Sequence, residues 1–176
     1  KKDASEQDVP RSDPHSARSI YTESKRLGEA ALGKILPDRA VFLRICLVYS
    51  KYAQKTDKRV MYQIIQKAYA DGIIKLLDSG SAIRQYCYIS DALEMMLNIR
   101  NLVTVNHKYS GVWNIANPKK ITILELAKTI GRIMQVKVVT GEEGGGVLDS
   151  LKEVSIFPKR YLEKFPNNMF TSLEIG

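Results

Sequence analysis

With 176 residues, the chain can form one domain, or one domain with a small appendage. Its composition, 44% hydrophobic and 26% charged, permits an ordinary core and excludes a disordered or fibrous protein. The longest apolar run, AVFLRICLVY, contains Arg44 and is too short to cross a bilayer, so no membrane association is expected.

The net charge is +8, and the lysines and arginines are spread along the chain rather than gathered in one block. Such a balance suits a nucleic-acid-binding domain or a protein that binds phosphorylated small molecules. No motif interleaves basic and aromatic residues, so no nucleic-acid partner is expected. The first residues, KKDASEQDVPRSDPH, are polar and unlike a secretory signal, which predicts a cytoplasmic protein.

The first expected elements are a loop and a helix. Prolines, serines and aspartates predict a loop over residues 1–18. A helix is predicted from Ile20 to Leu36, because Leu27, Ala31 and Ile35 form an apolar stripe at helical spacing. The run AVFLRICLVY follows and predicts a strand that is buried on both faces of a parallel sheet.

The rest of the chain alternates between strands and helices. A helix is predicted over Val60–Ala70, and IIKLLDSGSAIRQYCYI predicts two strands joined at a glycine turn as a β-hairpin. SDALEMMLNIRNL predicts a helix with Ser90 and Asp91 at its N-cap, and GVWNIA predicts a strand. TILELAKTIGRIM predicts a helix capped by Thr122, followed by a strand at QVKVVTG and a final helical turn or two. This alternation indicates an α/β layered fold.

The cysteines and histidines predict no metal site. Cys46 and Cys87 lie inside apolar stretches without CxxC spacing, which favours reduced, buried thiols. His15 and His107 lie far apart in polar segments, so a zinc site is not expected.

The stretch VKVVTGEEGGGVLDSLKEV imitates a strand, a glycine loop and a helix. A dinucleotide-binding loop needs GxGxxG spacing, so that backbone amides can approach a pyrophosphate. Here Gly141 is followed by two glutamates, which would repel phosphate. A flexible surface loop is the better interpretation.

Tyr21 and Lys25 stand four residues apart, so a helix places them on one face. An ammonium group beside a phenol favours the ionised form, which suits the pair to moving a proton from a hydroxyl group that is being oxidised. Two alternatives remain open. The residues could simply share a surface, or Lys25 could pair with Glu29, which is also four residues away.

Four blocks in order resemble the extended short-chain dehydrogenase/reductases: RSIYTESKRLGEAAL, VFLRICLVYS, DSGSAIRQYCYISDALEMML and GVWNIANPKKITILELAKTI. Among these the chain is most similar to the NAD-dependent epimerase/dehydratase family, near the UDP-glucuronate decarboxylase and dTDP-glucose 4,6-dehydratase type. The resemblance covers nearly the whole chain but only the C-terminal part of the family. The N-terminal cofactor-binding half, with its glycine-rich loop, is therefore expected to be absent.

The resemblance implies an α/β fold that is the C-terminal portion of a Rossmann-type parallel sheet with a smaller α/β substrate-binding lobe. Residues 1–50 would be the C-terminal part of the NAD-binding Rossmann domain and would carry the helix with the tyrosine and lysine. Residues 51–176 would form mainly the nucleotide-sugar-binding lobe, with returning Rossmann elements.

The resemblance also implies roles for four residues. Tyr21 would be the catalytic acid/base, and Lys25 would favour the ionised phenol and hold the nicotinamide ribose, so that both would bind the cofactor. Arg84 matches an arginine that meets the phosphates or ribose of the nucleotide-sugar substrate. Arg59 falls, more loosely, where the family places nucleotide contacts.

The implied function is that of an NAD-dependent nucleotide-sugar epimerase, dehydratase or decarboxylase that acts on a UDP- or dTDP-sugar through a keto-sugar intermediate. A homodimer is implied, and the isolated chain is expected to be inactive. The chain departs from the family after the buried strand, where Leu47 replaces a frequent asparagine and Ser50-Lys51 replaces a Gly-Pro turn. The alternative function is a non-catalytic dinucleotide- or nucleotide-binding module of dehydrogenase-like fold.

Overall fold

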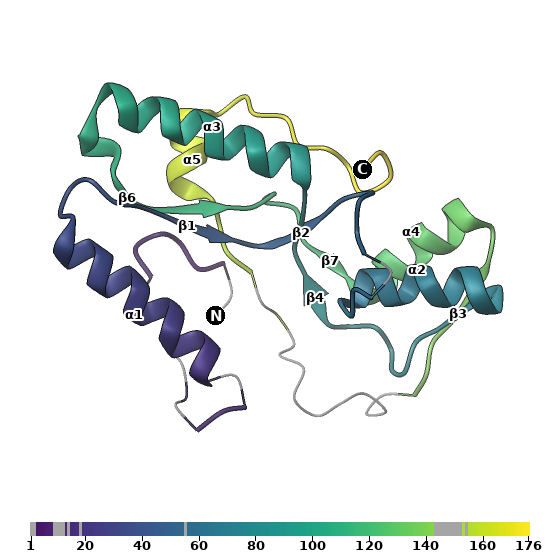
Figure 1. The fold of residues 1–176 in the computed structure, drawn as a ribbon. Coiled ribbons are helices and arrows are strands. Elements are labelled where there is room, and N and C mark those ends of the chain that lie inside the picture. The colour runs from purple at the N-terminus through teal and green to yellow at the C-terminus, as the bar shows by residue number, and fades with distance from the viewer. Residues whose placement is uncertain are drawn as a thin grey trace.

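The computed structural model describes residues 3–8, 13, 15–17, 19–54, 56–142, 153 and 155–176. The elements, in chain order, are α1 (Ser19–Ile35), β1 (Val41–Ile45), β2 (Leu47–Tyr49), α2 (Val60–Asp71), β3 (Ile73–Lys75), β4 (Ile83–Arg84), β5 (Tyr86–Tyr88), α3 (Ile89–Val105), the 3-10 helix η1 (His107–Tyr109), β6 (Gly111–Ile115), β7 (Ile121–Thr122), α4 (Ile123–Met134), β8 (Lys137–Val139) and α5 (Lys159–Lys164). Figure 1 shows that the elements form two groups in space. The first group contains α1, β1, β6, α3 and α5, and the second contains α2, α4 and β3. Strands β2, β4 and β7 lie between the groups.

Parallel pairing dominates the strands. β1 pairs with β6, β2 with β5 and β3 with β8, all in parallel, whereas β4 pairs with β7 in antiparallel. The predicted α/β fold with parallel strands is confirmed. The predicted division after residue 50 stays a prediction.

The strand expected over AVFLRICLVY is divided at Cys46. Before the break, β1 pairs with β6, and after it β2 pairs with β5. The expected burial on both faces is wrong, because Leu43, Ile45 and Leu47 are 36–48% exposed. In the described part of the chain β1 has one neighbouring strand, so it is not covered as the central strand of a wide sheet is.

The predicted β-hairpin around the glycine turn is also wrong. β3, β4 and β5 each pair with a strand from elsewhere in the chain, namely β8, β7 and β2. Gly80 does form a turn, with a φ of 69° that favours glycine. The turn therefore redirects the chain between partners rather than joining two strands that pair with each other.

The helix caps follow the sequence at α4 but not at α3. The hydroxyl of Thr122 accepts from the backbone N–H of Glu125 at 3.0 Å, and the Glu125 carboxylate accepts from the N–H of Thr122 at 2.7 Å. This confirms the predicted cap as a capping box. The predicted cap at Ser90 and Asp91 is wrong, because α3 begins at Ile89 and the Asp91 carboxylate accepts instead from Thr171 in the C-terminal segment.

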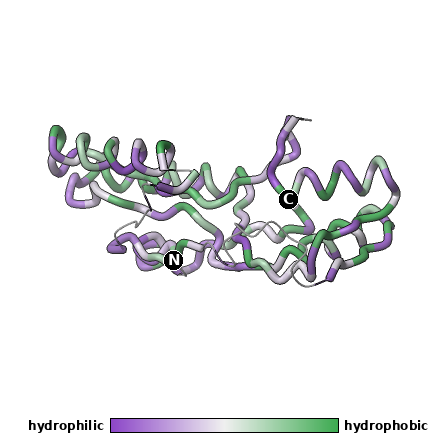
Figure 2. The backbone as a smooth tube through the Cα atoms, turned by 90° about the horizontal axis from the view of Figure 1, so that it is seen from below, coloured by the Kyte–Doolittle hydropathy of each residue, from purple (hydrophilic) through white to green (hydrophobic). Residues whose placement is uncertain are grey.

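Each group of elements has its own hydrophobic cluster, and Figure 2 shows hydrophobic and hydrophilic residues alternating along the helical turns. The first cluster joins α2 and α4 and contains the buried residues Tyr49, Met61, Tyr62, Ile64, Ala68, Ile74, Tyr86, Ile123, Leu126, Ala127 and Ile130. The second joins α3, α5 and β6 and contains Cys87, Ala92, Met95, Ile99, Trp113, Ile115 and Tyr161.

Several expectations have simpler outcomes. Both cysteines are free, and Cys87 is fully buried while Cys46 is half-buried. No group of metal ligands and no helix long and apolar enough to cross a membrane occurs among the described residues. Of the expected N-terminal loop, Ala4 forms a parallel bridge with Ile156. The expected flexible glycine loop lies mostly outside the described residues.

Helix α1 is fastened to β1 by one ion pair. Arg44 donates to the Glu29 carboxylate through Nη2 at 2.7 Å and Nε at 3.2 Å, a two-point geometry that is stronger than a single contact. Glu29 is therefore engaged by β1, which removes the alternative that it pairs with Lys25. No residue of α1 is buried, and Leu27 and Ile35 of its apolar stripe are exposed.

We expect Glu29→Gln to loosen α1, because the uncharged amide cannot form the two-point ion pair with Arg44. The cost should be about 1 kcal/mol of unfolding free energy. Amide hydrogen exchange along α1, with chemical denaturation, measures both effects. The matched control is Glu23→Gln, which removes the exposed pair with Arg26 on the same helix and should change stability by less than about 0.5 kcal/mol. Equal effects of the two substitutions would contradict this role of Glu29.

Candidate functional site

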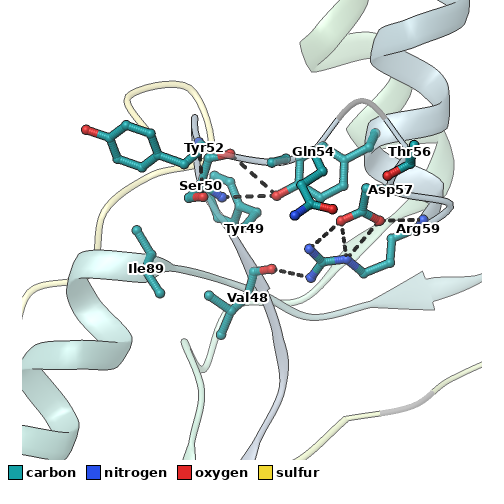
Figure 3. Close-up of a pocket in the computed structure, with 11 residues that line it drawn as sticks. Val48, Tyr49, Ser50, Tyr52, Gln54, Thr56, Asp57, Arg59 and Ile89 are labelled. Atoms are coloured by element: carbon teal, nitrogen blue, oxygen red, sulfur yellow. Dashed lines mark hydrogen bonds and ion pairs between the residues drawn. The ribbon is translucent and has the colours of Figure 1, made fainter.

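A pocket of about 450 Å³ lies where β2 ends and the chain turns toward α2. Because β2 and β5 are parallel, their carboxyl ends meet at the same edge, where open α/β sheets bind ligands. Figure 3 shows that its lining comes from the end of β2, the following loop, the start of α2 and the start of α3. The lining residues are Val48, Tyr49, Ser50, Tyr52, Ala53, Gln54, Thr56, Asp57, Arg59, Tyr62 and Ile89.

Arg59 is held in this pocket by Asp57 (Figure 3). Its Nη2 and Nε donate to the Asp57 carboxylate at 2.6 and 3.0 Å, and its Nη1 donates to the carbonyl of Val48 at 2.7 Å. Hydrogen bonds from Arg59 keep the pKa of Asp57 below its ordinary value. The guanidinium of Arg59 is thus fixed in orientation before any ligand arrives.

Tyr62 supports the same edge from α2. Its hydroxyl accepts from the backbone N–H of Ser50 at 3.1 Å, which fixes the start of the loop after β2. The guanidinium of Arg59 lies 5.0 Å from the Tyr62 ring centroid, within the range of a cation–π contact. One buried side chain therefore positions both the loop and the arginine.

Arg84 is the last residue of β4, and Tyr86 is the first residue of β5. Between them, the buried Gln85 bonds the carbonyls of Asn117 and Ile156 through Nε2 at 2.7 and 2.9 Å. Its Oε1 also accepts from the N–H of Ile156 at 3.0 Å. This amide fixes the backbone that presents Arg84 and Tyr86.

Arg59 lines the pocket, and Arg84 does not. Burial raises the pKa of Tyr86 to about 12, and the positive charges of Arg84 and Arg59 partly oppose that rise. Both guanidinium groups therefore act on the same phenol, although Arg59 and Arg84 come from separate segments of the sequence.

Tyr21 and Lys25 also lie together, on α1. The ammonium of Lys25 is 5.6 Å from the centroid of the Tyr21 ring, and Tyr21 is 67% exposed. Their placement on one helical face agrees with the sequence prediction. Among the described residues, no hydrogen bond or ring contact joins this pair to Arg59 or Arg84.

Sequence reasoning missed Asp57, Tyr62 and Tyr86. A local signal was present for two of them, since Asp57 stands two residues before Arg59 and Tyr86 two residues after Arg84. Tyr62 had no such signal, because its role depends on the loop after β2 folding back over α2.

Comparisons with known proteins assign the family. Residues 2–116 match the profile of the NAD dependent epimerase/dehydratase family. The chain belongs to this family. It is 27% identical over 128 residues to UDP-glucuronic acid decarboxylase 6 of Arabidopsis thaliana, an alignment that covers 71% of this chain and 36% of that protein. It is 27% identical over 120 residues to UDP-glucuronic acid decarboxylase 1 of Danio rerio, with coverages of 66% and 28%.

Solved structures of epimerase/dehydratase-type enzymes share the fold. MoeE5 in complex with UDP-glucuronic acid and NAD has a TM-score of 0.71 at 17% identity, covering all of this chain and 57% of that one. dTDP-glucose 4,6-dehydratase from Bacillus anthracis, in complex with NAD, has a TM-score of 0.66 at 16% identity, covering 97% and 54%. These likenesses confirm the predicted Rossmann-type fold class. The chain spans about a third of the length of the curated relatives it matches.

Proposed function

We propose that the intact protein is an NAD-dependent enzyme that modifies a nucleotide-sugar, with Tyr21 and Lys25 as its acid/base couple. The observation that carries the proposal is the placement of the phenol and the ammonium on one exposed face of α1, within a segment that matches the family. The curated relatives are UDP-glucuronic acid decarboxylases, which supports a UDP-sugar as substrate.

In this proposal Tyr21 removes the proton of a sugar hydroxyl. Bound NAD would accept the hydride of the same carbon, which gives a keto-sugar. Lys25 stabilises the ionised phenol by its charge. Its ammonium also has three donors, and together with the Tyr21 hydroxyl it suits the ribose hydroxyls of a nicotinamide cofactor, so the residues present fit the group.

Arg84 and Arg59 have a different task, which is to hold the anionic part of the substrate. A guanidinium engages phosphate through two parallel hydrogen bonds, and two such groups near one point compensate the charge of a diphosphate. Epimerisation, dehydration and decarboxylation share the first oxidation and differ in later steps. The proposal covers all three outcomes.

In the full-length protein, Tyr21→Phe should lower turnover by about 10²- to 10⁴-fold, because it removes only the ionisable hydroxyl. Lys25→Ala should lower both turnover and NAD retention, because one ammonium serves both. Product analysis with a panel of UDP- and dTDP-sugars measures turnover and identifies the reaction. The matched control is Tyr69→Phe, which alters an exposed tyrosine on α2 and should leave turnover unchanged. Turnover of Tyr21→Phe at the wild-type rate would show that the two residues merely share a helix face.

Arg84→Ala in the full-length protein should raise the Michaelis constant for the nucleotide-sugar by about 10- to 100-fold, through loss of charge-assisted hydrogen bonds. NAD content should stay unchanged, because the proposed cofactor contacts lie on α1. Arg132→Ala is the control, since Arg132 pairs with Glu174 at the surface of α4. An unchanged Michaelis constant would rule out the role of Arg84.

We further propose that the intact protein is a homodimer that packs α1 against its copy. The exposed apolar residues Ile20, Leu27 and Ile35 support this, and the small residues Gly28, Ala30 and Ala31 allow close approach of helices. Light scattering of the full-length protein should give twice the monomer mass. A monomeric mass would refute the proposal.

A further inference from the structure

The two cysteines of the chain lie next to each other, although they come from separate segments of the sequence. Cys87 is fully buried in β5 and belongs to the second hydrophobic cluster. Cys46, at the break between β1 and β2, packs against the same cluster. The two thiols share a hydrogen bond. The chain therefore holds a pair of thiols that the proposed function does not use.

Hydrogen bonds to one short segment hold the two cysteines in place. The backbone N–H of Cys46 donates to the carbonyl of Ile115 at 3.0 Å. Two residues further on, the carbonyl of Asn117 accepts from Nε2 of Gln85 at 2.7 Å, and Gln85 precedes Cys87 by two residues. The backbone N–H of Asn117 also hydrogen-bonds to both sulfur atoms. The same segment thus fixes the chain around each thiol.

The surroundings of the two thiols give them different reactivity. The hydrogen bond from Cys87 lowers the pKa of Cys46, against the effect of burial. Pairing with Cys46 and burial raise the pKa of Cys87. The thiolate is the nucleophilic form of cysteine, and Cys46 is half-buried whereas Cys87 is closed to solvent. Cys46 is therefore the thiol that a small oxidant reaches, and Cys87 is the neighbour that can react with the product.

We propose that Cys46 and Cys87 form a reversible oxidation site for a peroxide. The Cys46 thiolate attacks the O–O bond, which gives a sulfenic acid at Cys46 and releases the other oxygen as an alcohol or water. The Cys87 sulfur then displaces hydroxide from the Cys46 sulfur, which forms a disulfide and, with the proton of Cys87, one water molecule. Two electrons pass from the sulfurs to the peroxide. The bond ties the point where the chain changes strand partner to β5, the partner that it changes to.

The test is treatment of the folded full-length protein with limiting hydrogen peroxide, then alkylation of free thiols in denaturant and digestion with trypsin without reductant. Cys46 and Cys87 fall in separate tryptic peptides, 45–51 and 85–100, so a disulfide between them joins these peptides. Mass spectrometry should show the joined pair, lighter by two hydrogen atoms than the separate peptides. Dithiothreitol should release both. Recovery of both cysteines as alkylated free thiols after peroxide treatment overturns the proposal.

Two variants assign the order of the steps. In Cys87→Ala the sulfenic acid at Cys46 has no internal partner, so dimedone, which reacts with sulfenic acids, should give an adduct at Cys46 that the wild type lacks. In Cys46→Ser the buried Cys87 should stay a free thiol. Equal adduct formation in the wild type and Cys87→Ala overturns the role of Cys87, and oxidation of Cys87 in Cys46→Ser overturns that of Cys46. The wild-type digest decides the proposal even where a variant fails to fold.

Discussion

The geometry of this chain depends on the change of strand partner at Cys46. The backbone N–H of Cys46 donates to the carbonyl of Ile115 at 3.0 Å, which is the last contact with β6 before the chain pairs with β5. Because of this switch, β2 lies beside β5, with Leu47 opposite Tyr86 and Tyr49 opposite Tyr88, instead of continuing along β6. The loop after β2 then leads to α2, and Arg59 at the start of this helix donates back to the carbonyl of Val48 in β2.

The neutral amide of Gln85 fixes the backbone beside Arg84, and the carboxylate of Asp57 orients Arg59. Gln85 satisfies its amide entirely with backbone groups, so the backbone between β4 and β5 is fixed without adding charge beside Arg84. Asp57 orients Arg59 but also cancels part of its field. In the proposed function, an incoming phosphate would therefore compete with Asp57 for Arg59.

Local patterns predicted the elements, and long-range pairing decided what the patterns could not. The helix over residues 20–36, the cap at Thr122 and the parallel character of the strands follow from spacing and residue type within short windows. The supposed hairpin failed because β3, β4 and β5 choose partners far away in sequence, which no turn signal reports. The predicted cap at Asp91 failed for a similar reason, since Thr171 captures that carboxylate. In the site, the pair Tyr21 and Lys25 was visible from four-residue spacing. The position of Tyr86 was not, because it depends on the pairing of β5 with β2, which no local pattern reports.

The exposure of Tyr21 constrains how the proposed chemistry can operate. A phenol surrounded by water gains little from a nearby ammonium, because water screens the interaction between charges. The same pair in a water-excluded site interacts far more strongly. Catalysis by Tyr21 and Lys25 therefore requires a cover over this face of α1, and cofactor, substrate and other parts of the intact protein are the candidates to provide it. The exposed alternate residues of β1 lie on the same group of elements, and they too call for a covering surface. The proposed chemistry of Tyr21 and Lys25 and the exposed residues of β1 therefore have the same requirement. Both need other groups to cover the surfaces of α1 and β1.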